Sequence, residues 1–522
     1  MSNFTSKATG NWDTESTTTW NEAGHPVAGD TVTIQDTHTV TLDSTAACTT
    51  LTIDSGGTLT DATNNQGLTV SGLTSVTGTL TCGTAAMSFG STVVTTTYSI
   101  IIKNGGVFTG GSGTHTAGSF CGGTGSNVTY TSGVLTLNGE NTSAGAVQIF
   151  SNAMTFDDGN GTVTCTYTGD DTIFDMGGET HYNLIINAAD TTYTFRDPGT
   201  IANNLTITAG TVDTGVDDLT VTNLTNVSGT LTCNASTCSF GSGVTNNFAL
   251  TISGTFNGGT GTHTMGSFFL DNGTGTFTSG NTTLDSRQLS SVTFGAENGT
   301  FNHGSGTIIF TMANYQLLYD LTNTAKTFYN LIINKASNLV KFSNNSGFTL
   351  TIANNFTITS GEFDASERTG GASRDLIITG NLSNAGTFTP NSSLVTLNGT
   401  AQSLTGSWTF WHFTKSVTST DKLTFDNTAT YTFGGNVTLT GTSGNLLSLA
   451  SDSTGNAFDF VMSAGAVKTN LSYLSVKDSD ASGSDASQIA INPSNSIDVS
   501  GNTDWFSLTS GGSNIINNYY YY

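Results

Sequence analysis

The chain has 522 residues, and its 37 acidic against 13 basic side chains give a formal net charge of −24 at pH 7. Such a negative surface repels DNA, RNA and anionic lipid, so we expect no nucleic-acid partner. With 63 Gly, 4 Pro and only 10% charged residues, the composition lacks helix formers and favours strands joined by tight corners, so almost no helix is expected.

Residues 1–30 are interpreted as an N-terminal cap or attachment segment, because they contain Trp12, Trp20 and Pro26 but few of the repeats found later. We mark Trp12 and Trp20 as docking candidates, since aromatic side chains supply large amphipathic contact areas. The segment has no apolar core of the length a secretory signal needs, so we expect synthesis in a cytoplasm without general secretory export. No later stretch approaches the roughly 18 apolar residues of a membrane span, and no membrane insertion is expected.

Residues 31–475 contain short triplets in which apolar and polar residues alternate, as in Val32-Thr33-Ile34, Leu51-Thr52-Ile53 and Leu350-Thr351-Ile352. This alternation predicts strands that bury one face, with Leu, Ile, Val and Phe inward and mostly Thr outward. Pairs such as Gly56-Gly57 and Asn398-Gly399 lie between the triplets and permit the backbone angles of tight corners.

One long phrase occurs twice: the stretch from Leu68 to Phe120 returns from Leu219 to Phe268. The shift is 151 positions at Leu68 and 148 at His115, which matches His263, so three residues are missing from the second copy. We place the long repeat at about 68–210 and 219–360. Repetition of this kind predicts one structural unit stacked many times.

Two architectures fit such strands, an antiparallel sandwich array and a parallel β-helix. Sandwich strands should be joined by two-residue hairpins and show a regular domain period. Here the strand spacing is irregular, which a coil tolerates because insertions bulge out at its corners. We therefore predict an all-β fold, a right-handed parallel β-helix (solenoid) with an N-terminal cap and a short C-terminal tail.

The C-terminal end is divided into closing turns with a cap at 476–510, and a Gly/Ser hinge with a Tyr-rich tail at 511–522. The tail is either a disordered terminus or a docking peptide. In the second case its docking candidates are Tyr519, Tyr520, Tyr521 and Tyr522.

Side chains with metal-binding or catalytic chemistry are scattered. His115 and His263 occupy equivalent repeat positions, so corner or core histidines are expected rather than catalytic ones. Glycine-rich phrases before them resemble the calcium-binding nonapeptide, but histidine stands where that motif needs aspartate. The six cysteines lack two-residue spacing and are expected to be small buried hydrophobic residues; they are Cys48, Cys82, Cys121, Cys165, Cys233 and Cys238. We expect no metal, no cofactor and no catalytic residue.

Three adjacent acid pairs invite comparison with glycan-cleaving spikes, which use two carboxylates about 5 to 9 Å apart. They are Asp157 and Asp158, Asp170 and Asp171, and Asp217 and Asp218. Neighbours on a strand point to opposite faces, so these pairs are interpreted as solvated corner residues.

The opening of the chain resembles G8-like right-handed β-helix repeat proteins, through Gly10-Asn11-Trp12, Thr19-Trp20, Pro26, 29–34 and 56–59. The ending, from Leu474-Ser475-Val476 to Asp504-Trp505-Phe506, is similar to the closing segment of the same group. Members occur as bacterial surface proteins and as structural proteins of tailed phages. The resemblance implies a fold and a structural role rather than a site.

Three functions remain as hypotheses. The first is a non-enzymatic structural protein of a tailed-phage virion, assembled in the host cytoplasm: a tail fibre, spike or capsid-decorating rod. Its partners would be other virion proteins and host cell-surface polysaccharide, and it would be a homo-oligomer, with a trimer favoured. The second is a bacterial surface-layer protein or adhesin at the cell surface, exported without a classical signal. The third is a glycan-cleaving tailspike.

Overall fold

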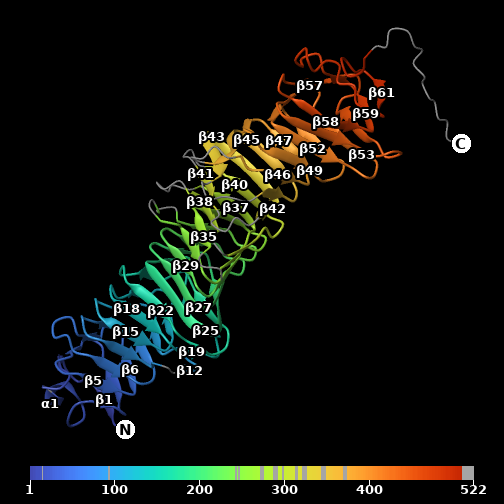
Figure 1. The fold of residues 1–522 in the computed structure, drawn as a ribbon. Coiled ribbons are helices and arrows are strands. Elements are labelled where there is room, and N and C mark those ends of the chain that lie inside the picture. Colours follow the sequence, from blue (N-terminus) through green and yellow to red (C-terminus); the bar gives the residue numbers. More distant parts are fainter. Residues whose placement is uncertain are drawn as a thin grey trace. The chain divides into compact units, whose positions relative to one another are not determined.

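The computed structural model divides the chain into two compact units, Met1–Gly306 and Thr307–Tyr522. The residues it describes are 1–14, 16–91, 94–241, 244, 247–270, 275–285, 292–296, 299–311, 316–319, 326–342, 349–367 and 373–507. The predicted fold class is confirmed: the protein is all-β, and its parallel strands stack as a right-handed β-solenoid (Figure 1). Within the described residues the one helix is α1 (Ser16–Thr19).

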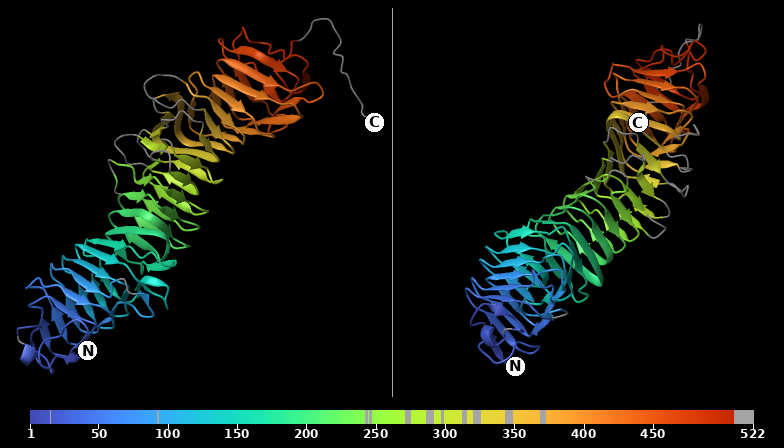
Figure 2. Two further views of the ribbon diagram at one scale, coloured as in Figure 1. Left: turned by 60° about the horizontal axis from the view of Figure 1, so that its bottom comes forward. Right: turned by 90° about the vertical axis from the view of Figure 1, so that its left-hand side faces the viewer.

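A typical turn of the N-terminal unit contributes three short strands, each of which pairs in parallel with its counterpart one turn later. Two successive turns are β6 (Thr50–Ile53), β7 (Thr58–Thr60) and β8 (Leu68–Val70), followed by β9 (Thr74–Val76), β10 (Thr79–Thr81) and β11 (Met87–Phe89). Figure 2 shows this stacking from two further sides. Because strands one turn apart are parallel neighbours, the sandwich alternative is excluded for this unit.

The alternating triplets produce continuous columns in the core. One column of strands consists of β2 (Gly10–Asn11), β4 (Thr39–Thr41), β7, β10, β14 (Val107–Thr109), β17 (Asn127–Thr129) and β21 (Thr155–Asp157). Its central residues are in register from turn to turn and buried: Val40, Leu59, Leu80, Phe108 and Val128. Threonines flank them on the outer face, so each turn adds an apolar layer inside and a hydroxyl layer outside.

The sequence repeat is also a structural repeat. Strands β8, β9, β10 and β11 match β28 (Leu219–Val221), β29 (Thr225–Val227), β30 (Thr230–Thr232) and β31 (Cys238–Phe240). The next matching strands are β13 (Ile100–Ile102), β14 and β15 (Thr114–Ala117), against β32 (Leu250–Ile252), β33 (Thr255–Asn257) and β34 (Thr262–Met265). The three missing residues fall at corners, one between β31 and β32 and two between β32 and β33. The matched strands therefore keep their lengths.

Residues 1–30 both build and cover the first turn. Strand β1 (Asn3–Thr5) pairs with β3 (Thr31–Ile34), and β2 pairs with β4. Trp12 and Trp20 are 1% and 0% exposed, and their rings meet edge to face with centroids 5.3 Å apart. The Trp20 indole N–H donates to the Trp12 carbonyl at 2.9 Å. These two residues therefore close the apolar interior at its first turn.

The C-terminal unit follows the same plan. One column consists of β42 (Lys326–Phe328), β44 (Leu350–Ile352), β46 (Leu376–Ile378), β49 (Leu394–Leu397), β52 (His412–Ser416), β55 (Asn436–Thr440) and β58 (Val467–Ser472). A second consists of β51 (Trp408–Phe410), β54 (Thr430–Phe433), β57 (Phe458–Met462) and β60 (Ser479–Asp480). Near its end Trp505 is buried, and its indole N–H donates to the Ser479 hydroxyl at 2.8 Å.

Candidate functional site

The two equivalent histidines lie in the core. His115 in β15 and His263 in β34 are 1% and 0% exposed. Each ring bonds through Nε2 to the carbonyl oxygen five residues earlier, at 2.5 Å to Gly110 and 2.6 Å to Gly258. Nε2 is therefore the protonated nitrogen, and each ring holds the glycine-rich corner before its strand. That use of the ring accounts for histidine at this position of a glycine-rich phrase.

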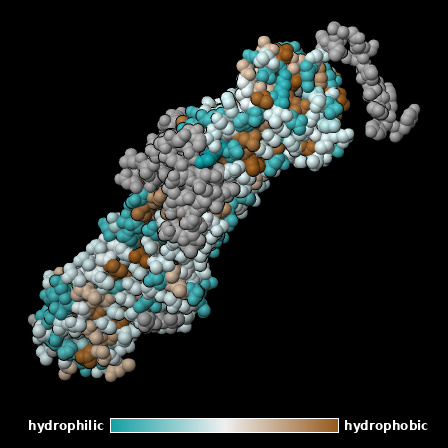
Figure 3. Space-filling view, viewed as in Figure 1, coloured by the Kyte–Doolittle hydropathy of each residue, from teal (hydrophilic) through white to brown (hydrophobic). Residues whose placement is uncertain are grey.

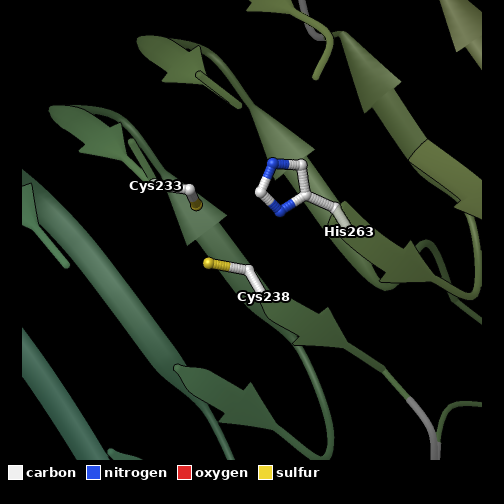
Figure 4. Close-up of side chains that lie close together, drawn as sticks. All are labelled: Cys233, Cys238 and His263. Atoms are coloured by element: carbon white, nitrogen blue, oxygen red, sulfur yellow. The ribbon is translucent and has the colours of Figure 1, made fainter. Parts of the chain in front are cut away.

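The two histidines differ at their second ring nitrogen. Nδ1 of His115 accepts a hydrogen bond from the Met87 amide at 3.2 Å. Nδ1 of His263 is buried and has no hydrogen-bond partner. Instead the ring faces the thiols of Cys233 and Cys238 (Figure 4). At this repeat position, both ring nitrogens of His115 are hydrogen-bonded, whereas Nδ1 of His263 has no hydrogen-bond partner.

The fold brings Cys233, Cys238 and His263 together from two successive turns. Cys233 follows β30, Cys238 begins β31, and Cys238 is the register partner of His263 in β34. One ligand atom from each residue can be chosen so that all three lie within 4.8 Å of one another. All three side chains are buried. Within the described part of the chain, this is the one group of three or more His, Cys, Asp or Glu side chains with the spacing of a metal site.

The pKa values of the two thiols are shifted in opposite directions, so Cys238 loses its proton more readily than Cys233. A hydrogen bond from the Cys233 thiol stabilises the Cys238 thiolate and, against the effect of burial, lowers the pKa of Cys238 to about 5; the Ser236 hydroxyl acts in the same direction. Burial and the same hydrogen bond raise the pKa of Cys233 well above its ordinary value. By contrast, burial raises the pKa of Cys48 to about 12. The cluster is therefore suited to hold a thiolate, which is the form of cysteine that binds metals.

Sequence reasoning missed this cluster. It identified Cys233 with Cys82 and His263 with His115, but it treated all six cysteines as small buried hydrophobic residues. The expectation of no metal stays a prediction; what the structure adds is that Cys233, Cys238 and His263 lie together. The available signal was position 238: the repeat places Cys238 where the first copy has Met87. Only the register between turns shows that this change faces His263.

The acid pairs lie at corners and bond to backbone amides. Asp157 and Asp158 accept hydrogen bonds from the amides two residues ahead, at 3.0 and 2.8 Å. Asp171 accepts from the Thr192 amide of the following turn at 2.8 Å, and Asp218 accepts from the Thr237 amide at 2.7 Å. These carboxylates satisfy corner amides, which gives them a structural role in the solenoid.

The docking candidates have different positions. The indoles of Trp12 and Trp20 are buried, so they present no free surface, and docking through them would require the cap to open. Tyr519, Tyr520, Tyr521 and Tyr522 lie outside the described residues. Sequence reasoning did not mark Trp411, which is 40% exposed at the corner between β51 and β52.

The Trp411 ring lies against Gly434 of the next turn. A Cβ on Gly434 would approach the ring to 2.8 Å, and the Gly435 amide donates to the Trp411 carbonyl at 2.7 Å. Glycine at 434 therefore leaves room for the indole, whose other surface is open to solvent. A partly exposed, well-supported indole is suited to stacking on an apolar face of a ligand.

Comparison with known proteins identifies one part of the chain. Residues 19–147 match the G8 domain family, which confirms that part of the resemblance seen in the opening of the chain. The protein is thus a β-solenoid with a G8 domain near its N-terminal end. No curated protein and no solved structure matches the chain. In the described residues no helix has the length and apolar character needed to cross a membrane.

Proposed function

We propose that this protein is a non-enzymatic structural component of a tailed-phage virion, a fibre, spike or capsid-decorating rod that contacts host surface glycan. The observation that carries the proposal is the stacking of in-register apolar residues through successive turns, with hydroxyl-bearing residues outside. A β-solenoid with a G8 domain is typical of a structural or surface protein. Its assignment to a virion rests on the resemblance of the opening and closing segments to phage structural proteins.

The strand pairing supports a mechanical role. Each inner strand of a unit is hydrogen-bonded to the turn before and the turn after it, as β10 is to β7 and β14. Separating two turns therefore breaks hydrogen bonds in three strand columns at once and exposes apolar side chains to water. Such a unit resists bending and stretching, as a fibre or spike requires.

The outer surface supports contact with a polar polymer. Thr41, Thr60, Thr81, Thr109 and Thr129 are register partners on successive turns, and each is partly exposed. Neighbouring strands lie about 4.8 Å apart, so their hydroxyls form a regular row. The face in Figure 3 is mostly hydrophilic or neutral, with small separate hydrophobic patches. Rows of hydroxyls and the Trp411 indole are suited to bind sugar hydroxyls and sugar ring faces.

The location is tested by immunogold labelling of the native particles with an antibody to this protein. Labelled purified virions and unlabelled uninfected cells would support the virion assignment. Label on the surface of uninfected bacteria, with none on particles, would instead establish the bacterial surface-layer or adhesin alternative.

Glycan contact is tested by pull-down with host surface polysaccharide. Wild-type protein should bind, Trp411→Ala should weaken binding about fivefold or more, since a stacked aromatic ring contributes about 1 to 3 kcal/mol, and Val467→Ala should bind as wild type. Val467 is a matched control because it is 52% exposed in the same unit. Equal binding by Trp411→Ala and wild type would exclude this surface. Release of reducing ends from the polysaccharide would replace the proposal with a glycan-cleaving spike.

A further inference from the structure

We propose that Cys233, Cys238 and His263 form a structural zinc site that fastens two successive turns of the N-terminal unit. The three ligand atoms lie within 4.8 Å of one another, and the side chains are buried. Donors 2.0 to 2.3 Å from a tetrahedral zinc are about 3.5 to 3.8 Å apart, so small side-chain rotations bring these atoms into place. The free Nδ1 of His263 is the independent sign of a ligand, because a buried nitrogen acceptor without a partner is costly.

The choice of metal follows from charge and donor type. Two thiolates and a neutral imidazole around Zn²⁺ give a complex with no net charge, which a buried apolar site tolerates best. The same ligands around Cu⁺ leave one negative charge. Thiolate and imidazole are both good zinc donors. Zinc binding displaces thiol protons, so the affinity of the site for zinc should rise with pH.

The surroundings complete the site. The hydroxyl oxygen of Ser236 is buried and lies 3.4 Å from the Cys238 sulfur, so an oxygen donor is available beside the three ligands. Nε2–H of His263 donates to the Gly258 carbonyl, which fixes the tautomer and leaves Nδ1 for the metal. Thr214 on the preceding turn holds the Ser236 hydroxyl at 2.6 Å.

The first copy of the repeat is a natural control. It keeps Cys82 and His115 but has Met87 in place of Cys238, and the Met87 amide occupies Nδ1 of His115. The two copies share their strand pattern, so methionine at this position is compatible with the fold. The Cys238→Met substitution therefore removes one ligand while it reproduces a packing arrangement that the chain already uses.

The test measures zinc in the whole chain and in three variants. After exposure to zinc and removal of free metal, wild type should retain about one zinc ion per chain, and Cys82→Ser should retain the same amount. Cys238→Met and His263→Gln should lose at least nine-tenths of it, with circular dichroism of both variants confirming the folded state. Added zinc should raise the melting temperature of wild type and leave that of Cys238→Met unchanged.

A zinc-free wild type would overturn the proposal, as would full zinc retention by Cys238→Met. So would mass spectrometry that finds Cys233 and Cys238 joined as a disulfide in the protein isolated under reducing conditions. Selective retention of copper when both metals are supplied would also overturn the assignment to zinc. Cobalt substitution with thiolate-to-cobalt charge-transfer absorption in wild type, absent in Cys238→Met, would support it.

Discussion

At the scale of single residues, the same residue type has different roles that only the register between turns reveals. His115 and His263 are both buried and both hold a glycine-rich corner, yet one of them also faces two thiols. The repeat allowed the sequence to predict core positions for both. It could not predict the thiol contact, because Cys238 and His263 are 25 positions apart and meet only through the length of one particular turn.

A third buried histidine, His181, makes ring contacts but no hydrogen bonds. His181 in β24 (Thr180–His181) is fully buried, and neither ring nitrogen has a hydrogen-bond partner. Its ring stacks on Phe150 at 5.9 Å and lies 5.1 Å from Phe156. Burial lowers the pKa of His181 to about 3. The folded protein therefore keeps this ring neutral at pH values where the unfolded chain takes up a proton.

His181→Phe is predicted to reduce acid sensitivity. As the pH falls below 6.5, the ordinary pKa of histidine, the unfolded state binds a proton at residue 181 and the folded state does not. The free energy of unfolding therefore decreases. By pH 4.5 the loss amounts to about 2 to 3 kcal/mol. Phenylalanine does not titrate and fits an aromatic cluster, so the variant should be at least as stable at pH 7. Urea unfolding at pH 7 and pH 4.5 measures both effects, and an unchanged difference between the two pH values would contradict the prediction.

At the scale of strands and corners, the sequence predicts strand type better than turn geometry. The apolar triplets identify the inward residues, because alternation has a period of two and depends only on neighbours. The length of a turn depends on corners, and these vary: Leu51 pairs with Thr74, whereas Ile100 pairs with Phe120, which gives turns of 23 and 20 residues. The position of every long-range contact depends on these corner lengths, which no local pattern encodes.

Corner glycines form a column in which a side chain has no room. A Cβ on Gly229 would lie 2.3 Å from the Gly210 carbonyl oxygen, and one on Gly254 would lie 2.0 Å from the Gly229 carbonyl oxygen. Successive turns thus approach so closely at this corner that backbone occupies the space of a side chain. The equivalent Gly78 in the first copy has the same relation to Gly57, at 2.2 Å.

Gly229→Ala is predicted to destabilise the N-terminal unit by on the order of 3 kcal/mol, because turns must move apart to admit the methyl group. Gly215→Ala is the matched control: its backbone φ is +61°, but nothing lies within 4 Å of the added atom. The control should cost about 1 to 2 kcal/mol, the penalty of a left-handed backbone for alanine. Urea unfolding measures the loss of stability in each variant. Equal losses in Gly229→Ala and Gly215→Ala would show that the close approach of successive turns does not add to the cost of a side chain at position 229.

At the scale of the whole molecule, a stack of turns needs its ends covered, because a bare first turn presents unpaired strand edges and apolar side chains. Trp12, Trp20 and α1 lie at the first turn of the N-terminal unit, and Trp505 lies among the last turns of the C-terminal unit. From unusual composition, the sequence analysis expected a cap or attachment segment at 1–30 and a closing cap at 476–510, and these bounds stay predictions. It did not predict the division between Gly306 and Thr307, because the long repeat continues across this position without a linker.

Trp20→Ala is predicted to loosen the first turn and leave the far end intact. Removing the buried indole costs about 3 to 5 kcal/mol, and in a stacked fold the loss falls on neighbouring turns. Hydrogen exchange should accelerate in residues 1–53 and stay unchanged in residues 470–507, and the variant should self-associate as its concentration rises. Trp411→Ala removes an exposed indole and should do neither. Uniformly faster exchange in Trp20→Ala would mean that the turns unfold as one cooperative block.

The corner between β13 and β14 is two residues longer than its counterpart between β32 and β33, while the flanking strands keep their register. The two copies therefore show that this corner accepts a difference of two residues while the strands on either side stay paired. A foreign peptide grafted between Ile102 and Val107 should be displayed on the outside of an otherwise unaltered scaffold. This corner is therefore a suitable place to present a foreign epitope, because its length already differs between the two copies of the repeat.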